Sequence, residues 1–294
     1  LKVYDIPIFY FPKFFHPDPT VKRKSGILTP SFTNSENIGA GFGLPYFWAI
    51  ARNKDLTFTP KIYNDENNLF FTEYRQAFEK GFLTLDTSYT SGYKNTTTTK
   101  TDGSRNHIFA EIDLDLAKEK EYKSNLSVTT QHTSNDTFFK IHDVNTALVT
   151  PDKTNLENKI NYDFNNSDIK LNVYGAVYEN TKIKNDSRYE YMLPNILFEK
   201  SFLTQKFGAL DFKSNVYHRN YETNKYLTFL SNDILWSPAS FISKKGFVNN
   251  FNGVVNNTNY EGKNTTGFKT SKTTEFSSVI SYKSSLPLKK DGEN

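Results

Sequence analysis

The five histidines are the first side chains to consider for chemistry, because histidine can transfer a proton or bind a metal near neutral pH. Their positions are His16, His107, His132, His142 and His218. None of them forms a metal-binding motif with a neighbour, and the chain has no cysteine that could supply a thiolate ligand or a disulfide. We therefore expect neither a metal centre nor a cofactor.

One histidine has a serine and an aspartate close by. His132, Ser134 and Asp136 are the residue types of a hydrolytic triad. A triad is defined by geometry and not by proximity in sequence, so a turn at Ser134–Asp136 is the better interpretation. The sequence also has neither a G-x-S-x-G motif nor a glycine-rich phosphate loop. We expect the chain not to be an enzyme.

Three consecutive cations, Lys22, Arg23 and Lys24, could bind phosphate groups through charge-assisted hydrogen bonds. A solvated basic turn is an equally good interpretation of the same residues. The net charge of the whole chain is only +4, which is too small to indicate nucleic-acid binding by itself. We therefore expect no nucleic acid among the partners.

A run of alternating residues contains the acidic group Glu111, Asp113 and Asp115. Carboxylates can bind divalent cations, but a spacing of two is simply the spacing of one face of a β-strand, so no metal site follows. The other face of the same segment is apolar. It consists of Ile108, Ala110, Ile112, Leu114 and Leu116. The segment therefore predicts a strand with one apolar and one acidic face.

The same period of two recurs along the chain. From Ile169 to Val177 the odd positions are apolar or glycine, while the even positions include Lys170 and Asn172. Similar segments are Leu56–Ile62, Leu83–Tyr89, Leu126–Thr130, Leu210–Val216 and Phe276–Tyr282. This pattern predicts many strands, each apolar on one side only.

The composition agrees with a β-rich protein and excludes several other classes. Hydrophobic residues make up only 36% of the 294 residues, yet aromatic residues reach 16%. A helical bundle would be richer in leucine and alanine, and a disordered chain would be poorer in aromatic residues. No run of eighteen apolar residues is present, so we expect no membrane-spanning helix.

Segment length and loop pattern favour a membrane barrel over a soluble β-sandwich. Short breaks at 64–67 and 79–81 alternate with longer polar tracts such as 95–105, and aromatic residues such as Phe138 and Phe139 stand near segment ends, where they could form interfacial girdles. We predict an all-β fold, a large antiparallel transmembrane outer-membrane β-barrel, with on the order of 12 to 14 strands after Ser25. In such a barrel Glu111, Asp113 and Asp115 would face the lumen.

Five motifs stand in an order that resembles one family. They are Asp5–Pro12 (DIPIFYFP), Lys22–Pro30 (KRKSGILTP), Leu44–Ala51 (LPYFWAIA), Asp55–Pro60 (DLTFTP) and Glu73–Arg75 (EYR). Weaker matches follow at Ser134–Phe139 and Leu193–Pro194. Together these motifs resemble the LPS-assembly protein family (LptD, also called OstA), with Ile27 in place of the family's usual phenylalanine.

The resemblance implies a domain organisation. Residues 1–24 would hold the last strand of a periplasmic OstA-like β-jellyroll and a link, and residues 25–294 would form the N-terminal part of the outer-membrane barrel. Because an isolated half barrel leaves two unpaired edges, we expect the natural protein to continue beyond this segment.

The resemblance also implies a function. The chain would be part of a translocon of Gram-negative bacteria that inserts lipopolysaccharide into the outer leaflet through a barrel lumen and a lateral gate, with its N-terminal end in the periplasm. The partners would be lipopolysaccharide, outer-membrane lipid, an LptA-like periplasmic bridge protein and an LptE-like plug lipoprotein. Lys22, Arg23 and Lys24 would then meet lipopolysaccharide phosphates.

The first two predicted strands contain residues that weaken a sheet. Pro30 and Pro45 donate no ladder hydrogen bond, and Gly39, Gly41 and Gly43 share one face of the second strand. We interpret these residues as a lateral gate, as the resemblance also implies. The alternative is that both prolines lie at strand ends or bulges, where proline usually occurs in sheets.

Three other function classes remain open at this point. A porin-like or substrate-specific outer-membrane channel would share the alternation but needs no proline-weakened strands. An outer-membrane enzyme would need a catalytic group in the lumen or at the rim. A soluble β-rich binding protein would be extracted without detergent.

Overall fold

The computed structural model describes residues 2–3, 6–7, 23–36, 38–92, 103–117, 121–205 and 207–287. Most of the predicted periplasmic segment 1–24, including Lys22, and most of the polar tract 95–105 lie outside these residues. Within segment 1–24, β1 (Lys2–Val3) and β2 (Ile6–Pro7) pair as a separate two-stranded sheet. Among the described residues, no helix has the length and apolar character needed to cross a bilayer.

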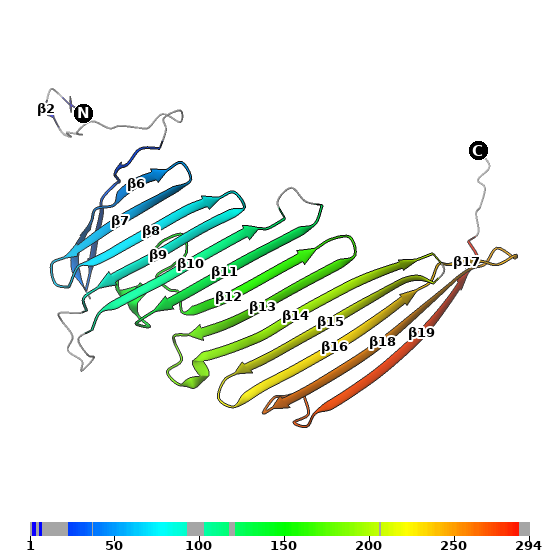
Figure 1. Ribbon diagram of the computed structural model, residues 1–294. Helices are drawn as coiled ribbons and strands as arrows, with labels where there is room; N and C mark the ends of the chain where they lie inside the picture. The colour runs from blue at the N-terminus through cyan, green and yellow to red at the C-terminus, as the bar shows by residue number, and fades with distance from the viewer. Residues whose placement is uncertain are drawn as a thin grey trace.

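All the other strands belong to one antiparallel sheet (Figure 1). The first half consists of β3 (Gly26–Ile27), β4 (Ser31–Ser35), β5 (Gly39–Gly43), β6 (Tyr46–Ala51), β7 (Lys54–Tyr63), β8 (Leu69–Phe78), β9 (Gly81–Thr90), β10 (Arg105–Asp115) and β11 (Lys123–Thr133). The second half consists of β12 (Asn155–Asn165), β13 (Ile169–Asn180), β14 (Tyr189–Thr204), β15 (Gly208–Tyr221), β16 (Lys225–Ser237), β17 (Phe241–Ile242), β18 (Val248–Lys263) and β19 (Thr273–Ser285). Two short helices, α1 (Phe138–Ile141) and the 3-10 turn η1 (Asp186–Arg188), lie in connections.

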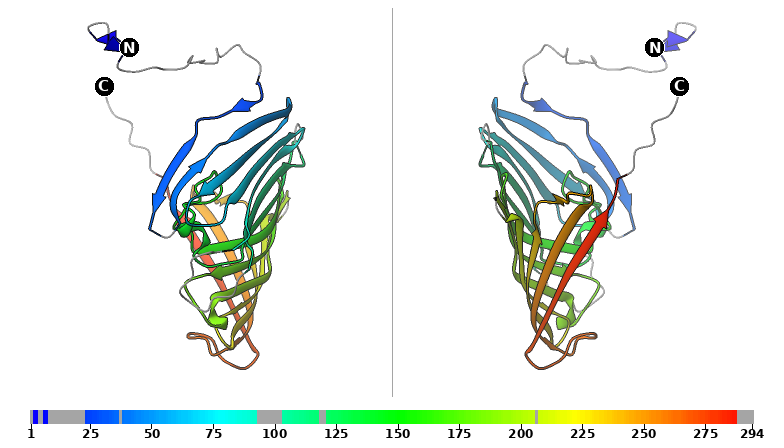
Figure 2. Two further views of the ribbon diagram at one scale, coloured as in Figure 1. Left: turned by 90° about the vertical axis from the view of Figure 1, so that its left-hand side faces the viewer. Right: turned by 90° about the vertical axis from the view of Figure 1, so that its right-hand side faces the viewer.

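The strands follow one another as the curved wall of a barrel (Figures 1 and 2). If β3 with β4 and β5 with β6 are each counted as one interrupted strand, and β17 as a short piece beside β18, fourteen strands cross the wall in the described part of the chain. The strand order closes the ring between β19 and β3. At this junction, however, no residue-by-residue register is formed among the described residues, and β19 is in register with β18 alone. The predicted all-β barrel class is confirmed.

The connections divide into two sets because consecutive strands are antiparallel. One set lies at the end of the wall where Arg23 leads into β3, and we call it the N-terminal side; except for 238–247, its connections are short. The opposite end carries the connections 91–104, 134–154, 181–188 and 264–272, and we call it the loop side. This asymmetry is typical of outer-membrane barrels.

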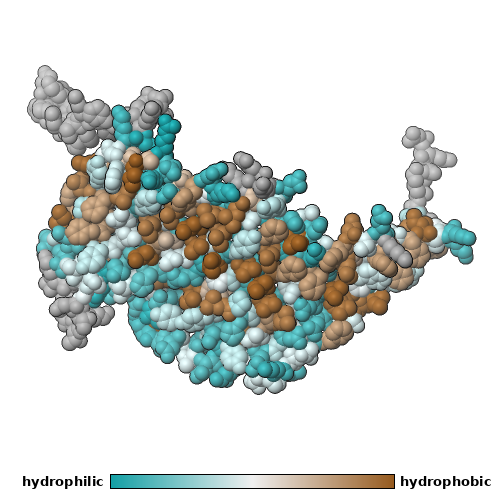
Figure 3. Space-filling view, in the orientation of Figure 1, coloured by the Kyte–Doolittle hydropathy of each residue, from teal (hydrophilic) through white to brown (hydrophobic). Residues whose placement is uncertain are grey.

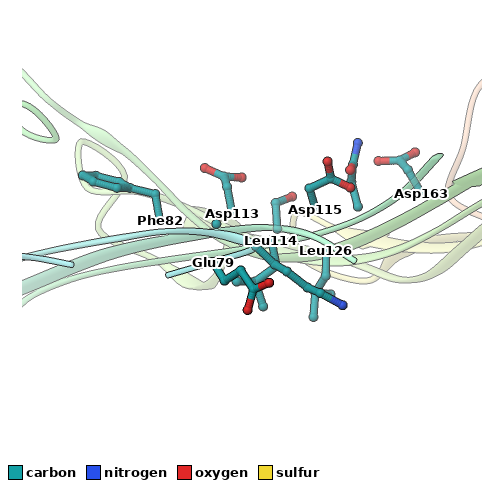
Figure 4. A pocket seen from close by; sticks show the side chains of 11 residues that line it. Glu79, Phe82, Asp113, Leu114, Asp115, Leu126 and Asp163 are labelled. Carbon is teal, nitrogen blue, oxygen red and sulfur yellow. The ribbon is translucent and has the colours of Figure 1, made fainter. Parts of the chain in front are cut away.

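Alternation along the strands gives the wall two different faces. On the outer face Phe58, Ile62, Ile108 and Ile160 are between 38% and 55% exposed, and Figure 3 shows apolar side chains gathered in a band across the strands. Figure 4 shows Asp113, Asp115 and Asp163 pointing to one side of the sheet, while Leu114 and Leu126 point to the other. The predicted alternation from Ile108 to Leu116 is therefore confirmed.

One connection of the loop side folds against the concave face of the wall (Figure 2). This segment, residues 134–154, contains α1, and we call it the luminal loop. It buries Phe138, Phe139, Val144 and Val149 in one hydrophobic cluster. The wall contributes the remaining buried members of that cluster, which are Ile38, Tyr63, Leu69, Phe109 and Leu156.

The interpretation of Phe138 and Phe139 as interfacial girdle residues was wrong. Both side chains are at most 2% exposed, and the Phe139 ring packs edge to face against the rings of Phe109, His107 and Phe138 inside the wall. The physical reason is that the luminal loop offers its apolar residues a core to fill, and burial of an aromatic ring there removes a large apolar area from water.

Candidate functional site

The first two strands of the wall are both interrupted at a proline. Residues 28–30 separate β3 from β4, and Leu44 and Pro45 separate β5 from β6. Pro30 therefore lies between two strand segments and not within a continuous strand. Both predicted prolines stand at strand ends, which is the location that the alternative interpretation gave.

The two interruptions lie beside each other, and a third proline lies next to them. The backbone N–H of Leu28 donates to the carbonyl oxygen of Pro45 at 2.8 Å. The N–H of Leu44 in turn donates to the carbonyl oxygen of Pro60 in β7 at 3.2 Å. Pro45 and Pro60 thus accept hydrogen bonds from the two interrupted segments, and none of the three prolines can donate a ladder hydrogen bond.

The interruptions leave few pairs between the first two strands. β3 pairs with β6 at two positions and β4 pairs with β5 at five, whereas β15 and β16 pair without a break at thirteen. Each backbone hydrogen bond contributes on the order of 1 kcal/mol net. Separation of the first two strands therefore needs much less free energy than separation of two later ones.

The predicted glycine face lies on the inner side of β5. Gly41 and Gly43 are buried, and Gly39 has a positive φ of 72°. A Cβ atom at Gly41 would lie 2.6 Å from the ring of Tyr63. One at Gly43 would lie 2.5 Å from the hydroxyl of Ser31. The space beside the glycines is therefore filled by neighbouring side chains: Tyr63 at Gly41, Ser31 at Gly43, and Asn64 and Asp65 at Gly39.

A buried carboxylate holds the chain at its entrance into the wall. Asp55 of β7 is 3% exposed and accepts hydrogen bonds from the guanidinium groups of Arg23 and, at 2.9 Å, Arg75. The Arg23 guanidinium also lies 5.5 Å from the centre of the Phe47 ring. Of the three predicted phosphate-binding residues, Arg23 is thus paired with a protein carboxylate, Lys24 is exposed, and Lys22 lies outside the described residues.

Sequence reasoning missed Asp55 as the partner of Arg23, although a signal was present. Asp55 and Arg75 both belong to motifs of the family resemblance, and they face each other in the register of β7 and β8. A prediction of that register would have paired Asp55 with Arg75 and identified Asp55 as an ion-pair acceptor, although not its contact with Arg23.

The luminal loop packs behind this region from the inside. Ile38, in the turn between β4 and β5, and Tyr63 belong to the same hydrophobic cluster as Phe138 and Val144. The His142 ring centre lies 6.0 Å from that of Tyr63. Burial, together with the positive charge of Lys61, lowers the pKa of His142 to about 4, so the imidazole is neutral at pH 7. The hydroxyl of Thr146 donates to the buried carboxylate of Asp86 in β9.

Sequence reasoning also missed this loop as part of the site. The signal in the sequence was a group of apolar residues in a connection, among them Phe138, Phe139, Ile141, Val144, Leu148 and Val149.

The three residues of the possible triad do not meet. His132 lies opposite Ile108 on the outer face. The Ser134 hydroxyl accepts from the backbone N–H of Asn106 at 2.8 Å. Asp136 binds Lys184 and, at 2.9 Å, Arg188. Partial burial alone would raise the pKa of Asp136, but the hydrogen bonds from these two cations outweigh it and hold the pKa below its usual value.

Two of the three predicted luminal carboxylates, Asp113 and Asp115, line a cavity at the N-terminal side of the wall, whereas Glu111 does not. Asp113, Asp115 and Asp163 border a space of about 610 Å³ (Figure 4). In the described part of the chain, no group of three or more histidine or carboxylate side chains is arranged to hold a metal ion.

The chain is similar in sequence to LPS-assembly proteins. No family model matches the chain. The LPS-assembly protein LptD of Nitrosococcus oceani is 32% identical over 129 residues, which are 42% of this chain and 17% of that protein. The LptD of Shewanella oneidensis is 44% identical over 75 residues, 26% of this chain and 10% of that protein. The LptD of Francisella tularensis subsp. novicida is 29% identical over 132 residues, 43% and 15% respectively.

These relatives confirm the resemblance that the sequence motifs indicated. The matched part of this chain corresponds to between 10% and 17% of the length of these three relatives. The chain is therefore similar to one segment of LPS-assembly proteins.

Proposed function

We propose that this chain forms the N-terminal part of an outer-membrane barrel that inserts lipopolysaccharide into the outer leaflet through its lumen and a lateral gate. The observation that carries the proposal is the pair of adjacent proline interruptions in the first two strands, within motifs that resemble LPS-assembly proteins. The relatives are named as assembly proteins, which is compatible with a function other than catalysis.

The two faces of the wall suit the two halves of an amphiphilic substrate. The inner face carries charged and amide side chains such as Glu111, Asp113 and Asn172, along which sugars and phosphates can move in water. The outer face is apolar and contacts lipid, where the acyl chains must arrive. A substrate of this kind needs an opening in the wall, because every paired strand is a barrier to the sideways movement of the sugars.

The opening that we propose lies between β3–β4 and β19. This junction has no register among the described residues, and the interruptions at Pro30 and Pro45 weaken the strands beside it. Gly39, Gly41 and Gly43 add no side chains of their own to the inner face of the second strand, so that when β5 moves past Tyr63 no side chain of these three residues stands in the way. The gate is thus formed by the loss of ladder bonds and by the smooth glycine face.

Lys22, Arg23 and Lys24 would contact lipopolysaccharide phosphates on the N-terminal side, which we assign to the periplasm. Arg23 can exchange its carboxylate partner Asp55 for a phosphate, because its side chain remains 50% exposed. The partners that follow from the resemblance are an LptA-like bridge protein on the periplasmic side and an LptE-like plug lipoprotein in the lumen.

Depletion of the full-length protein in its host, followed by measurement of surface lipopolysaccharide, tests the proposal. We expect lipopolysaccharide to be lost from the surface and to accumulate at the inner membrane or in the periplasm. Unchanged surface lipopolysaccharide together with a lost uptake of small solutes would contradict the proposal and support a porin-like channel instead.

A further inference from the structure

A second cavity lies at the loop side of the wall, at the opposite end from the acidic cavity of Figure 4. It has a volume of about 530 Å³ and lies between the luminal loop and the connection 181–188. Its floor is apolar and includes Phe139, which is 2% exposed, and Pro151. Ligand sites commonly combine such an apolar floor with a few polar groups at the rim.

The rim of this cavity is cationic. The lysines that line it are Lys140, Lys153, Lys182 and Lys184. Lys184 is paired with Asp136, but among the described residues no ion pair is formed by the other three. The rim also has two carboxylates. Asp136 forms ion pairs with both Lys184 and Arg188, and Asp152 is exposed. The cavity therefore has an excess of positive charge.

The walls of the cavity are fixed by hydrogen bonds. Thr181, which is 3% exposed, donates its backbone N–H and its hydroxyl to the carbonyl oxygen of Thr154, at 2.9 Å and 3.1 Å. Arg188 connects Asp136 of the luminal loop to Glu179 at the end of β13. These contacts hold the two connections together, so little ordering is needed before a ligand binds.

We propose that this lysine cavity binds a phosphorylated saccharide, with the phosphate at the lysine rim and a sugar ring on the apolar floor. Ammonium groups form strong, charge-assisted hydrogen bonds with phosphate oxygens, and the apolar face of a sugar ring can pack against the partly exposed Pro151. The carboxylates of the opposite cavity, by contrast, would repel the same ligand.

Two sources of the phosphate are consistent with this chemistry. One is the headgroup of lipopolysaccharide in the outer leaflet, an assignment that rests on the proposed function. The other is a soluble phosphate compound outside the cell, and this assignment does not rest on the proposed function. Binding by the purified protein is independent of export, so failure of this inference and failure of the proposed function can be told apart.

The test uses the full-length protein in detergent and inorganic pyrophosphate as the probe, with affinity measured by titration calorimetry. The variant Lys140→Gln/Lys153→Gln/Lys182→Gln should bind pyrophosphate roughly tenfold more weakly or worse, because three charge-assisted contacts are lost. The matched control is Lys263→Gln/Lys269→Gln/Lys272→Gln, which removes the same charge from the loop side away from the cavity. It should keep the affinity of the unmodified protein.

Equal affinities of the cavity variant and the unmodified protein would overturn the inference, and so would an equal loss in the control. Retained heat-modifiability on gels establishes that each variant is folded. If the triple variant does not fold, Lys182→Gln alone, at an exposed position, should still weaken binding by about threefold.

A photo-crosslinking residue at Thr137, on the cavity wall, then separates the two sources in living cells. If the triple lysine variant has lost pyrophosphate binding, a crosslink from position 137 to lipopolysaccharide identifies the lipid headgroup as the source of the phosphate. Its absence identifies a soluble phosphate as the ligand, and both results support the site.

Discussion

The first and the last strands of this wall are stabilised in different ways. β4 and β5 have five residues each, whereas β14 and β18 have sixteen each and pair continuously with their neighbours apart from one bulge. Yet the wall residues of the hydrophobic cluster come from the first half and from β12: in the described residues, its last buried member is Leu156. The first strands are held by side-chain packing, and the last strands by hydrogen-bonded ladders.

This difference matters for a wall that must open. Ladder bonds between the first two strands can break while the luminal loop continues to hold β7, β8 and β10 through buried side chains. A break between β15 and β16 would instead cost many bonds at once, because their ladder has no interruption. The molecule therefore has one region suited to local separation and another suited to rigidity.

A proline alone does not create an interruption. Pro194 lies within β14, where the register with β15 shifts between Met192 and Asn195 but the strand continues. Pro30 and Pro45, by contrast, lie in adjacent strands at neighbouring positions, and both strands stop there. The two interruptions adjoin each other through the hydrogen bond from the Leu28 N–H to the Pro45 carbonyl, so both strands lack a donor in the same part of the sheet.

The largest expected effect concerns the cluster behind the first strands. Phe139→Ala should lower the free energy of unfolding by about 3–5 kcal/mol, because a fully buried ring is lost and a cavity remains. Phe202→Ala, in β14 at a position that is 43% exposed, should cost about 1 kcal/mol or less. Urea unfolding of the full-length protein in detergent measures both. Equal costs would show that the two regions are not stabilised differently.

A proline inserted into the last strands should have the next largest effect. Asn232 of β16 pairs with Ser214 on one side and with Asn257 on the other. Asn232→Pro should lower the unfolding free energy by roughly 3 kcal/mol, because a donor is lost and the opposite carbonyl is left unpaired. Thr29→Pro, within the first interruption, should change it by less than about 1 kcal/mol. A similar loss in both variants, in the same urea measurement, would contradict the assignment of rigidity to the ladder.

Acidification should weaken the packing behind the first strands. The pKa of His142 is lowered to about 4 in the folded protein, so the unfolded chain binds the proton more readily below pH 6.5. The contribution of neutral His142 to the free energy of unfolding is fully present above pH 6.5 and is lost as the pH falls towards 4. Between pH 7.5 and pH 4.5 it should amount to about 2–3 kcal/mol.

The variant His142→Phe is the control for this pH dependence. Urea unfolding at both pH values should show a smaller difference for His142→Phe than for the unmodified protein, by the amount that His142 contributes. An unchanged pH dependence would exclude His142 as its source.

The smallest expected effect concerns the carboxylate at the entrance to the wall. Asp55→Asn should lower the free energy of unfolding by about 1–2 kcal/mol. The substitution removes the buried carboxylate that pairs with two arginines, and the loss stays moderate because both arginines are themselves partly exposed. Glu199→Gln, which removes a more exposed partner of Lys170 and Lys213, should cost less than about 1 kcal/mol. The urea unfolding midpoints of the two variants test this order. A larger loss of stability for Glu199→Gln than for Asp55→Asn would mean that Asp55 does not hold the first strands.

The strands could be predicted from sequence because their signal is local. The apolar positions from Ile108 to Leu116 and from Ile169 to Val177 alternate in the sequence itself, and β10 and β13 cover both segments. Pro30 and Pro45 were recognised for the same reason, since proline lacks a donor in any surroundings. What these residues could not reveal is that their strands stop there.

The buried parts of the site could not be predicted because they depend on contacts between distant residues. Asp55 meets Arg23 only when the chain doubles back through three strands, and Phe138 is buried only when residues 134–154 fold against the wall. A loop that contains two phenylalanines is equally consistent with burial against the wall and with anchoring at the membrane interface, because the local sequence does not indicate which surface the rings contact.

Replacement of both gate prolines tests the central claim most directly. Pro30→Ala/Pro45→Ala in the full-length protein restores two donors to the first two strands, and Pro238→Ala/Pro287→Ala is the matched control outside the strands. The measurement is the fraction of newly made lipopolysaccharide that reaches the cell surface. We predict that this fraction falls in the gate variant, because the strands beside the junction no longer separate easily, and that it is unchanged in the control. Normal export by a folded Pro30→Ala/Pro45→Ala protein would contradict the lateral gate.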